Sequence, residues 1–511
     1  MLMDELSAHQ HKIAFRVLAL AIIAMGVVVS YQLYPASERF VLHPDDHNAY
    51  IFGREVLRHG TPAIPYVRLD PTNVTPYPVF APVGSRLNTE GQVVTSGAPG
   101  IYYLLAPVAW SFEASLAYIQ VACAVSLFVF YLYLERHFPG WAAIVGLAAL
   151  AGSASVLFWG SFLMPNAPAV GLLFGGLLLV DGVRPTRKFA GGFLVVLSAI
   201  FRFEYLILVM TLGIGWLVSM RHSWRTTPIT AWALLGGMSA GALLLGALSW
   251  ILYGTANVIA VSRNTPTAFD ETLTGTIANT GISVFQGSFL NFTPFVMVFG
   301  LACICIPFLE RRGGQTHLPL VVGVFGMMAY ILFTGFSPQV FFMSHSYTRY
   351  VLPLVAVGSL GIALAWNSAP RWTRVALAAT VVLTITASIV IVAGPDGFGT
   401  AREIEHRALQ ERAFADLLPA DAILIGDQQS KWVDSRQTLA PSAIPVETRD
   451  AILHDIVFRM LASGHHLYVS RSTLSFEGRD QLLAQSDLAF EETADHHFWR
   501  ILLKPTAGDK T

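Results

Sequence analysis

Charged side chains are scarce in this sequence. Only 13% of the 511 residues are charged, against 54% that are hydrophobic. Soluble domains carry roughly 25% charged residues, so the composition excludes an ordinary soluble enzyme. Apolar runs of about 20 residues recur along the chain, and this is the length that crosses a hydrocarbon core about 30 Å thick. The sequence therefore predicts a polytopic membrane protein.

Cysteine is also rare, and neither positive nor negative charge is in strong excess. The three cysteines, Cys123, Cys303 and Cys305, all lie in apolar stretches, which excludes a framework of exported disulfides. The net charge is −1, with a mildly basic membrane part and an acidic region after residue 395. This balance gives no indication of nucleic acid as a partner.

The basic residues predict how the chain crosses the membrane. Short connections such as DGVRPTRK and RHSWRTTP are rich in Arg and Lys, which favours the cytoplasmic side. The first apolar run lacks a clear cleavage site and is interpreted as a retained span with a cytoplasmic N-terminus. The predicted spans lie near residues 14–34, 112–134, 141–160, 163–180, 229–253, 292–309, 318–336, 350–366 and 375–394.

The segment 189–220 must cross an even number of times, because both connections that flank it favour the cytoplasm. It is too short for two ordinary spans of about 20 residues. We expect either two short helices or a re-entrant hairpin that meets around Phe201-Arg202-Phe203-Glu204. Ionisable groups at this depth are costly, so Arg202 and Glu204 indicate an internal cavity. With two short spans here, the total is about 11.

Three regions fall on the non-cytoplasmic side by this count: the first loop at 35–111, the loop at 254–291 and the C-terminal region. The first external loop, 35–111, is rich in proline, and its PGIYYLLAPVAW segment predicts a short helix at the membrane surface. From residue 395 the chain reads as strands at ADAILIGD and HHLYVSR, a helix at RDAILHDIVFRMLASG and a closing strand at FEETADHHFWRILLKP.

The predicted fold class is therefore a mainly α-helical polytopic membrane protein with a small C-terminal α/β extracytoplasmic domain. Residues 1–394 form the transmembrane domain, and residues 395–511 form the α/β domain. We expect the protein in the plasma (inner) membrane.

The stretch HPDDHNAYIFGREVLRHGTP, residues 43–62, holds the first candidate site residues. Asp45 and Asp46 stand where a helix begins, so they can serve as its cap and acidic first turn. Either carboxylate can also act as a general base. A third reading is a divalent-metal site made by Asp45, Asp46 and His43, with His47 in support. The sequence leaves these readings open.

A second candidate stretch is SHSYTRYVLP, residues 344–353, at the outer end of a predicted span. Arg349 can make a bidentate contact to a phosphate, with Tyr350 beside it and His345 in support. The alternative is that these side chains anchor a helix end at the headgroup layer. Arg202 has a similar choice between a phosphate and an ion pair with Glu204.

The order of these motifs resembles the GT-C superfamily of membrane glycosyltransferases, which includes protein O-mannosyltransferases and lipid A aminoarabinose transferases. One span is followed by the acidic DD..AY...GREVLRHG helix, then SGAPGIYYLLAP, and much later TRYVLPLVAVGSL. The resemblance covers roughly residues 14–394. The Lys-Gly pair that is frequent in the broken middle helices of that superfamily is replaced here by Arg202-Phe203-Glu204.

The resemblance implies a polyprenyl-phosphate-linked sugar donor, with Asp45 or Asp46 as base and Arg349 beside the donor phosphate. The hypothesis is an inverting glycosyltransferase of cell-envelope glycan biosynthesis that acts on the hydroxyl of a glycan, lipid or protein acceptor at the outer face. A divalent metal is a possible cofactor. The competing hypotheses are a transporter or flippase of lipid-linked glycan, and a non-catalytic membrane assembly subunit.

Overall fold

The structure is a computed structural model that describes part of the chain. The described residues are 2–33, 44–65, 85–87, 92–95, 98–203, 205–219, 228–256, 352–399, 413, 415, 417–419, 422–425, 438–439, 449–470, 487–494 and 498–504. The predicted spans at 292–309 and 318–336, and the predicted site residues from His345 to Tyr350, lie outside this part of the chain.

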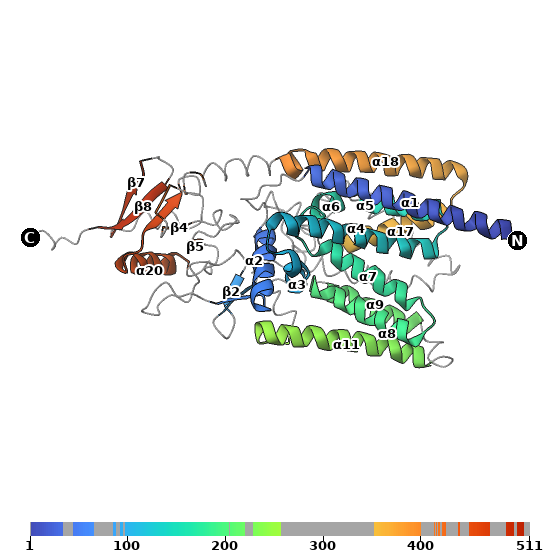
Figure 1. Cartoon of the computed structure of the whole chain (residues 1–511), viewed down its shortest axis with the longest axis horizontal. Coiled ribbons are helices and arrows are strands. Elements are labelled where there is room, and N and C mark those ends of the chain that lie inside the picture. Colours follow the sequence, from blue (N-terminus) through green and yellow to red (C-terminus); the bar gives the residue numbers. More distant parts are fainter. Residues whose placement is uncertain are drawn as a thin grey trace, which may run out of the picture.

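The transmembrane region is a slab of helices that run side by side (Figure 1). Within the described residues, four helical stretches are long and apolar enough to cross a membrane. They belong to α1 (Leu2–Leu33), α4 (Phe112–His137), α11 (Pro228–Tyr253) and α18 (Arg371–Ala393). Shorter apolar helices accompany them: α5 (Trp141–Ala151), α7 (Asn166–Val180), α9 (Tyr205–Ser219) and α17 (Leu352–Ser368). The architecture is that of a multi-pass membrane protein.

Exposed tryptophans mark the two edges of the slab. Trp232 and Trp250 on α11 are each 63% exposed and lie about 27 Å apart along the helix at 1.5 Å per residue. This span is close to the thickness of a hydrocarbon core, about 30 Å. Trp110 and Trp141 are also exposed, directly before and after α4. Tryptophan favours membrane–water interfaces, so these side chains fit a bilayer of ordinary thickness.

The parts of the first loop that the structure describes gather at one end of the slab, opposite the N-terminus (Figure 1). They comprise α2 (Pro44–His59), α3 (Gly100–Leu105), the 3₁₀ turn η1 (Ala106–Val108) and a small antiparallel sheet. The sheet has the order β1-β3-β2, formed by Ala63–Pro65, Gln92–Thr95 and Ser85–Leu87. We did not predict this sheet, because strands this short show no alternating pattern.

The predicted span at 141–160 is wrong as a single helix. The chain breaks at Gly152 and Ser153, and a second helix, α6 (Ala154–Trp159), follows α5. Ser153 begins α6 because its hydroxyl accepts the N–H of Val156 at 3.3 Å, as an N-cap residue does. The next predicted span also begins later than expected, at Asn166, directly after Pro165.

Two short helices occupy 185–219, which is the first of the two arrangements predicted for this segment. Helix α8 (Pro185–Leu197) continues into the 3₁₀ turn η2 (Ser198–Ile200), and α9 begins at Tyr205. Phe201 and Phe203 in the break are 8% and 6% exposed. Buried rings on both sides therefore fix the position of the residue between them, Arg202.

A five-stranded sheet with the order β5-β4-β6-β8-β7 lies beyond α2 (Figure 1). Its strands are Thr438–Leu439, Ile423–Ile425, Leu467–Ser470, Phe498–Leu503 and Leu488–Glu492, in that spatial order. One face packs against α20 (Arg449–Ala462). Residues of the other face, Leu424, Tyr468 and Phe498, share one apolar cluster with Phe52 of α2. This second face therefore joins the sheet to the first loop.

The predicted strands at ADAILIGD and HHLYVSR and the helix between them are confirmed. The single closing strand predicted at FEETADHHFWRILLKP is wrong, because β7 and β8 form an antiparallel hairpin with Glu492 opposite Trp499. Thr493 closes the turn, since its N–H and its hydroxyl both donate to the carbonyl of Phe498, at 2.9 and 2.8 Å.

Candidate active site

Helix α2 carries the predicted carboxylates Asp45 and Asp46 and is buried at Asp46. Pro44 is its first residue, a position that proline favours. Asp45 and Asp46 fall in the first turn, where negative charge is favourable toward the helix dipole. Asp46 is 0% exposed, and the apolar residues Ala49 to Phe52 that follow it are buried as well. Leu57, near the C-terminal end of the helix, is 46% exposed.

Three contacts hold α2 against the elements that follow it in the chain. The ring of Phe52 lies 5.5 Å from that of Tyr102 on α3, and the ring of Tyr50 lies 5.6 Å from that of Phe112 on α4. Gly53 faces η1 closely enough that a Cβ there would lie 3.4 Å from the side chain of Ala109. Asp46 is therefore carried by an element that is packed on both α3 and α4.

Arg54 adds a cation to the same side of α2. Asp46, Tyr50 and Arg54 follow at intervals of four, the spacing of neighbours on one helix face. The guanidinium carbon of Arg54 lies 5.6 Å from the centre of the Tyr50 ring, and its Nε is buried with no hydrogen-bond partner among the residues described. Arg54 was not among the predicted site residues. The signal for it in the sequence is its spacing of eight residues from Asp46, which places both on one face of the helix.

Arg202 lies beside α3 at this end of the slab. A Cβ on Gly100 of α3 would come within 2.7 Å of the carbonyl oxygen of Ile200, so α3 and η2 are in direct contact. Phe203 packs in a cluster with Ala63 and Val94 of the first-loop sheet. The predicted cation thus stands between the first loop and the broken helix pair.

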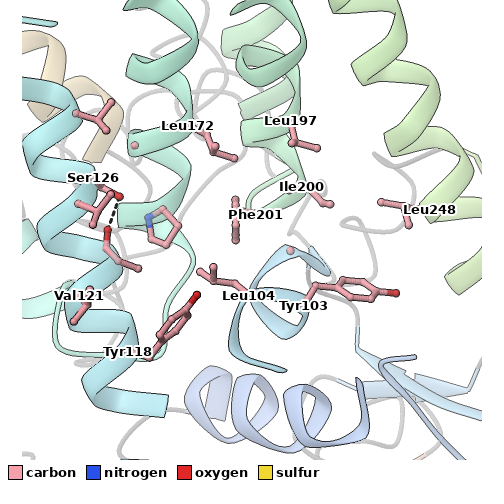
Figure 2. A pocket seen from close by; sticks show the side chains of 16 residues that line it. Tyr103, Leu104, Tyr118, Val121, Ser126, Leu172, Leu197, Ile200, Phe201 and Leu248 are labelled. Carbon is pink, nitrogen blue, oxygen red and sulfur yellow. Dashed lines mark hydrogen bonds between the residues drawn. The ribbon is translucent and has the colours of Figure 1, made fainter. Parts of the chain in front are cut away.

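A largely apolar cavity of about 790 Å³ is lined by Phe201, the residue that precedes Arg202. Its wall combines α3, α4, α7, α11 and the end of α8, and Phe201 stands near its centre (Figure 2). Val121 and Val125 on the α4 wall are 60% and 56% exposed, so the cavity reaches the lipid-facing surface. Small-molecule pockets have volumes of about 300–1,000 Å³. A hydrocarbon chain could therefore enter this cavity from the bilayer.

Three hydroxyl groups interrupt the apolar wall, those of Tyr103, Tyr118 and Ser126. Neither these hydroxyl groups nor the cavity could be predicted from the sequence. On α4 the lining residues Tyr118, Val121, Ala122 and Val125 recur at helical spacing, but a lipid-facing stripe shows the same pattern.

The structure brings two of the predicted site residues, Asp46 and Arg202, to the same end of the slab. It describes the backbone of Asp45 and His47 within α2 but not their side chains. The other predicted residues, His43, Glu204, His345, Arg349 and Tyr350, lie outside the described residues. Their roles stay predictions. No group of three His, Cys, Asp or Glu side chains suited to a metal occurs in the described part of the chain.

No curated protein and no protein-family model matches the sequence. Solved structures do match. ArnT from Cupriavidus metallidurans bound to undecaprenyl phosphate is similar with a TM-score of 0.58 and 11% identity, over 95% of this chain and 99% of ArnT. The same enzyme in its apo state gives a TM-score of 0.57 and 11% identity, over 95% of this chain and 98% of ArnT.

The arabinofuranosyltransferase AftD from Mycobacteria is similar with a TM-score of 0.45 and 14% identity, over 97% of this chain and 40% of AftD. ArnT and AftD are both GT-C membrane glycosyltransferases. The likeness to ArnT extends over almost the full length of both chains. The chain therefore has the fold of ArnT, and the GT-C resemblance inferred from its motifs is confirmed at the level of the fold.

Proposed function

We propose that this protein is a glycosyltransferase that moves a sugar from a polyprenyl-phosphate-linked donor to an acceptor hydroxyl. The observation that carries the proposal is the apolar cavity, which opens toward lipid and is lined at one end by α3 and by Phe201, the residue before Arg202. A hydrocarbon chain in the cavity would bring a phosphate to this end of the slab. The fold supports the proposal, because ArnT has been crystallised with undecaprenyl phosphate.

The phosphate of the donor would lie at Arg202, with Arg349 and Tyr350 as further contacts. Arg is suited to this role because its planar guanidinium binds two phosphate oxygens at once. Negative charge grows on the phosphate as the glycosidic bond breaks, and fixed cations stabilise that charge in the transition state. Replacement of Arg349 by Lys should weaken donor use for the same reason.

Asp45 or Asp46 would remove the proton from the acceptor hydroxyl. The activated oxygen then attacks the anomeric carbon from the face opposite the leaving phosphate, which inverts the configuration at that carbon. A general base must reach the proton it takes. The packing of α2 holds the backbone of both Asp residues in place.

We place this chemistry at the outer face of the plasma membrane, with the N-terminus in the cytoplasm. The C-terminal region 395–511 would act as an extracytoplasmic α/β domain that lies over α2. The apolar cluster that its strands share with Phe52 supports this arrangement.

Separate Asp45→Asn and Asp46→Asn variants test the base. In purified protein, transfer from a polyprenyl-phosphate sugar should fall by about 100-fold or more for the variant that removes the base, the range ascribed to general-base catalysis. Asp181→Asn is the matched control, because Asp181 pairs with His137 at 2.7 Å at the opposite end of α4. Full activity in both folded variants would refute the assignment.

A further inference from the structure

We propose that the hydroxyl of Tyr118 donates a hydrogen bond to the phosphate of a polyprenyl phosphate bound in the cavity. This inference rests on the proposed function and names a binding residue for its donor. It follows from the distribution of polar atoms along the cavity wall.

The three hydroxyls of the wall differ in what they already bind. Ser126 donates to the carbonyl of Ala122 at 2.7 Å, so its proton is engaged within α4. The hydroxyls of Tyr103 and Tyr118 make no hydrogen bond within the described structure. The cavity therefore offers two available donors, and both belong to tyrosines.

Both tyrosines stand at the α3 end of the cavity. Tyr118 lies in the second turn of α4, whereas the lining residue Val129 lies about 16 Å further along the helix at 1.5 Å per residue. The wall beyond Ser126 is apolar. A polar end and an apolar length match a molecule with a headgroup and a hydrocarbon tail, with its head toward α3.

The two side chains point in different directions (Figure 2). The hydroxyl of Tyr118 points into the cavity beside Leu104, while Tyr103 extends toward α11 and Leu248. Tyr118 is therefore the donor aimed at a ligand. Burial raises the pKa of the Tyr103 phenol, so this second group stays neutral and adds no negative charge near a phosphate.

Tyr118 on α4 would complement Arg202, which directly follows the cavity-lining residue Phe201 in the chain. Phe201 lines the cavity on the side of α8 and α9, and Arg202 is the next residue in the chain. A phosphate at this end would meet a cation on one side and a neutral hydroxyl on the other. A purely hydrocarbon ligand would cover the Tyr118 hydroxyl without giving it an acceptor, which is unfavourable.

The test compares two ligands that differ only in the phosphate. Purified full-length protein is titrated with a polyprenyl phosphate and with the polyprenol of the same chain length, and both Kd values are measured. Tyr118→Phe removes a single oxygen atom. We expect the Kd for the polyprenyl phosphate to rise about tenfold, the size expected for a hydrogen bond to a charged group, and the Kd for the polyprenol to stay unchanged.

Tyr133→Phe is the matched control, because Tyr133 is a buried tyrosine near the opposite end of α4 and does not line the cavity. It should change neither Kd. An equal rise for both ligands in Tyr118→Phe, or no rise for either, would overturn the inference and leave the proposed function standing. If the wild-type protein binds the phosphate no better than the polyprenol, the proposed donor fails together with the inference.

Discussion

At the scale of single residues, the site depends on polar groups that their buried neighbours hold in place. Arg202 has the clearest support, because Phe201 is inserted in the cavity and Phe203 in the first-loop cluster. The backbone of Arg202 cannot move far unless one of these rings leaves its contacts. Its position is therefore tied to both the lipid cavity and the first loop.

Arg202→Lys should raise the KM for the donor about tenfold, because Lys keeps the charge but cannot form the two-pronged contact to phosphate. Arg202→Gln should raise it further. Initial rates against donor concentration measure both effects. Arg374→Lys serves as the control, since Arg374 donates to the carbonyl of Trp366 at 2.9 Å in the helix connection at the opposite end. An unchanged donor KM in both Arg202 variants would contradict the phosphate contact.

At the scale of elements, the first loop is fitted onto the helix slab without spare room. Gly100 of α3 rests on Ile200, and Gly53 of α2 faces Leu105 of α3 and Ala109, the residue after η1. Helices α2 and α3 and the start of α4 thus form one packed unit. An atom added to Gly100 on the side that faces η2 would force the backbone of one of the two elements to move.

Gly100→Ala should lower the free energy of unfolding by about 1–3 kcal/mol, the usual effect of overpacking. The added methyl group would meet the carbonyl of Ile200, which cannot rotate away. Thermal unfolding of the purified protein measures the change. Gly246→Ala on α11 is the control, because no atom lies within 4 Å of a Cβ there. Equal unfolding temperatures for the two variants would show that α3 is not in tight contact with η2.

The mouth of the cavity offers a test on α4. Val125→Trp places a large ring at an exposed lining position, so it should obstruct the entry of a chain without disturbing the helix interior. The donor KM should rise about tenfold, while the kcat at saturating donor should change little. Met210→Trp is the control, because Met210 on α9 is 59% exposed and does not line the cavity. Identical kinetics in the two variants would exclude this route of entry.

The sequence predicted elements wherever a strong pattern or a breaker was present. The helix pair around Phe201 and the strands and helix of the C-terminal sheet are examples. It missed the split at Gly152 and Ser153, because both halves are apolar and hydropathy averages over them. It also missed Tyr118, since hydropathy does not distinguish a helix face that lines a cavity from one that faces lipid. Asp46 and Arg202 stand out in the sequence because ionisable groups beside or within apolar segments are rare, and their roles stay predictions.

At the scale of the whole molecule, the two ends of the helix slab differ in the elements that they carry. The N-terminus lies at one end of the slab, and α2, α3 and the C-terminal sheet lie at the other (Figure 1). Exposed tryptophans at both edges leave a band between them that matches a bilayer. The proposed chemistry therefore belongs to one side of the membrane alone.

Single cysteines in a cysteine-free background can assign that side. Leu57→Cys on α2 should react with a membrane-impermeant maleimide in intact cells. Trp372→Cys, at the start of α18, should react only after the membrane is permeabilised. Both positions are exposed, at 46% and 85%, so access to the reagent decides the outcome. Labelling in the reverse order would invert the proposed topology.

Val121 and Val125 are exposed where the cavity reaches the lipid-facing surface. The donor concentration that governs the reaction is therefore its concentration in the membrane and not in the aqueous phase. A donor that enters sideways between helices arrives by diffusion in the plane of the membrane, in two dimensions. Its effective concentration is a mole fraction of the surrounding lipid. Dilution of proteoliposomes with buffer should then leave the rate per vesicle unchanged, while dilution of the donor with inert lipid should slow it. The supply of carrier within the leaflet would therefore regulate this protein.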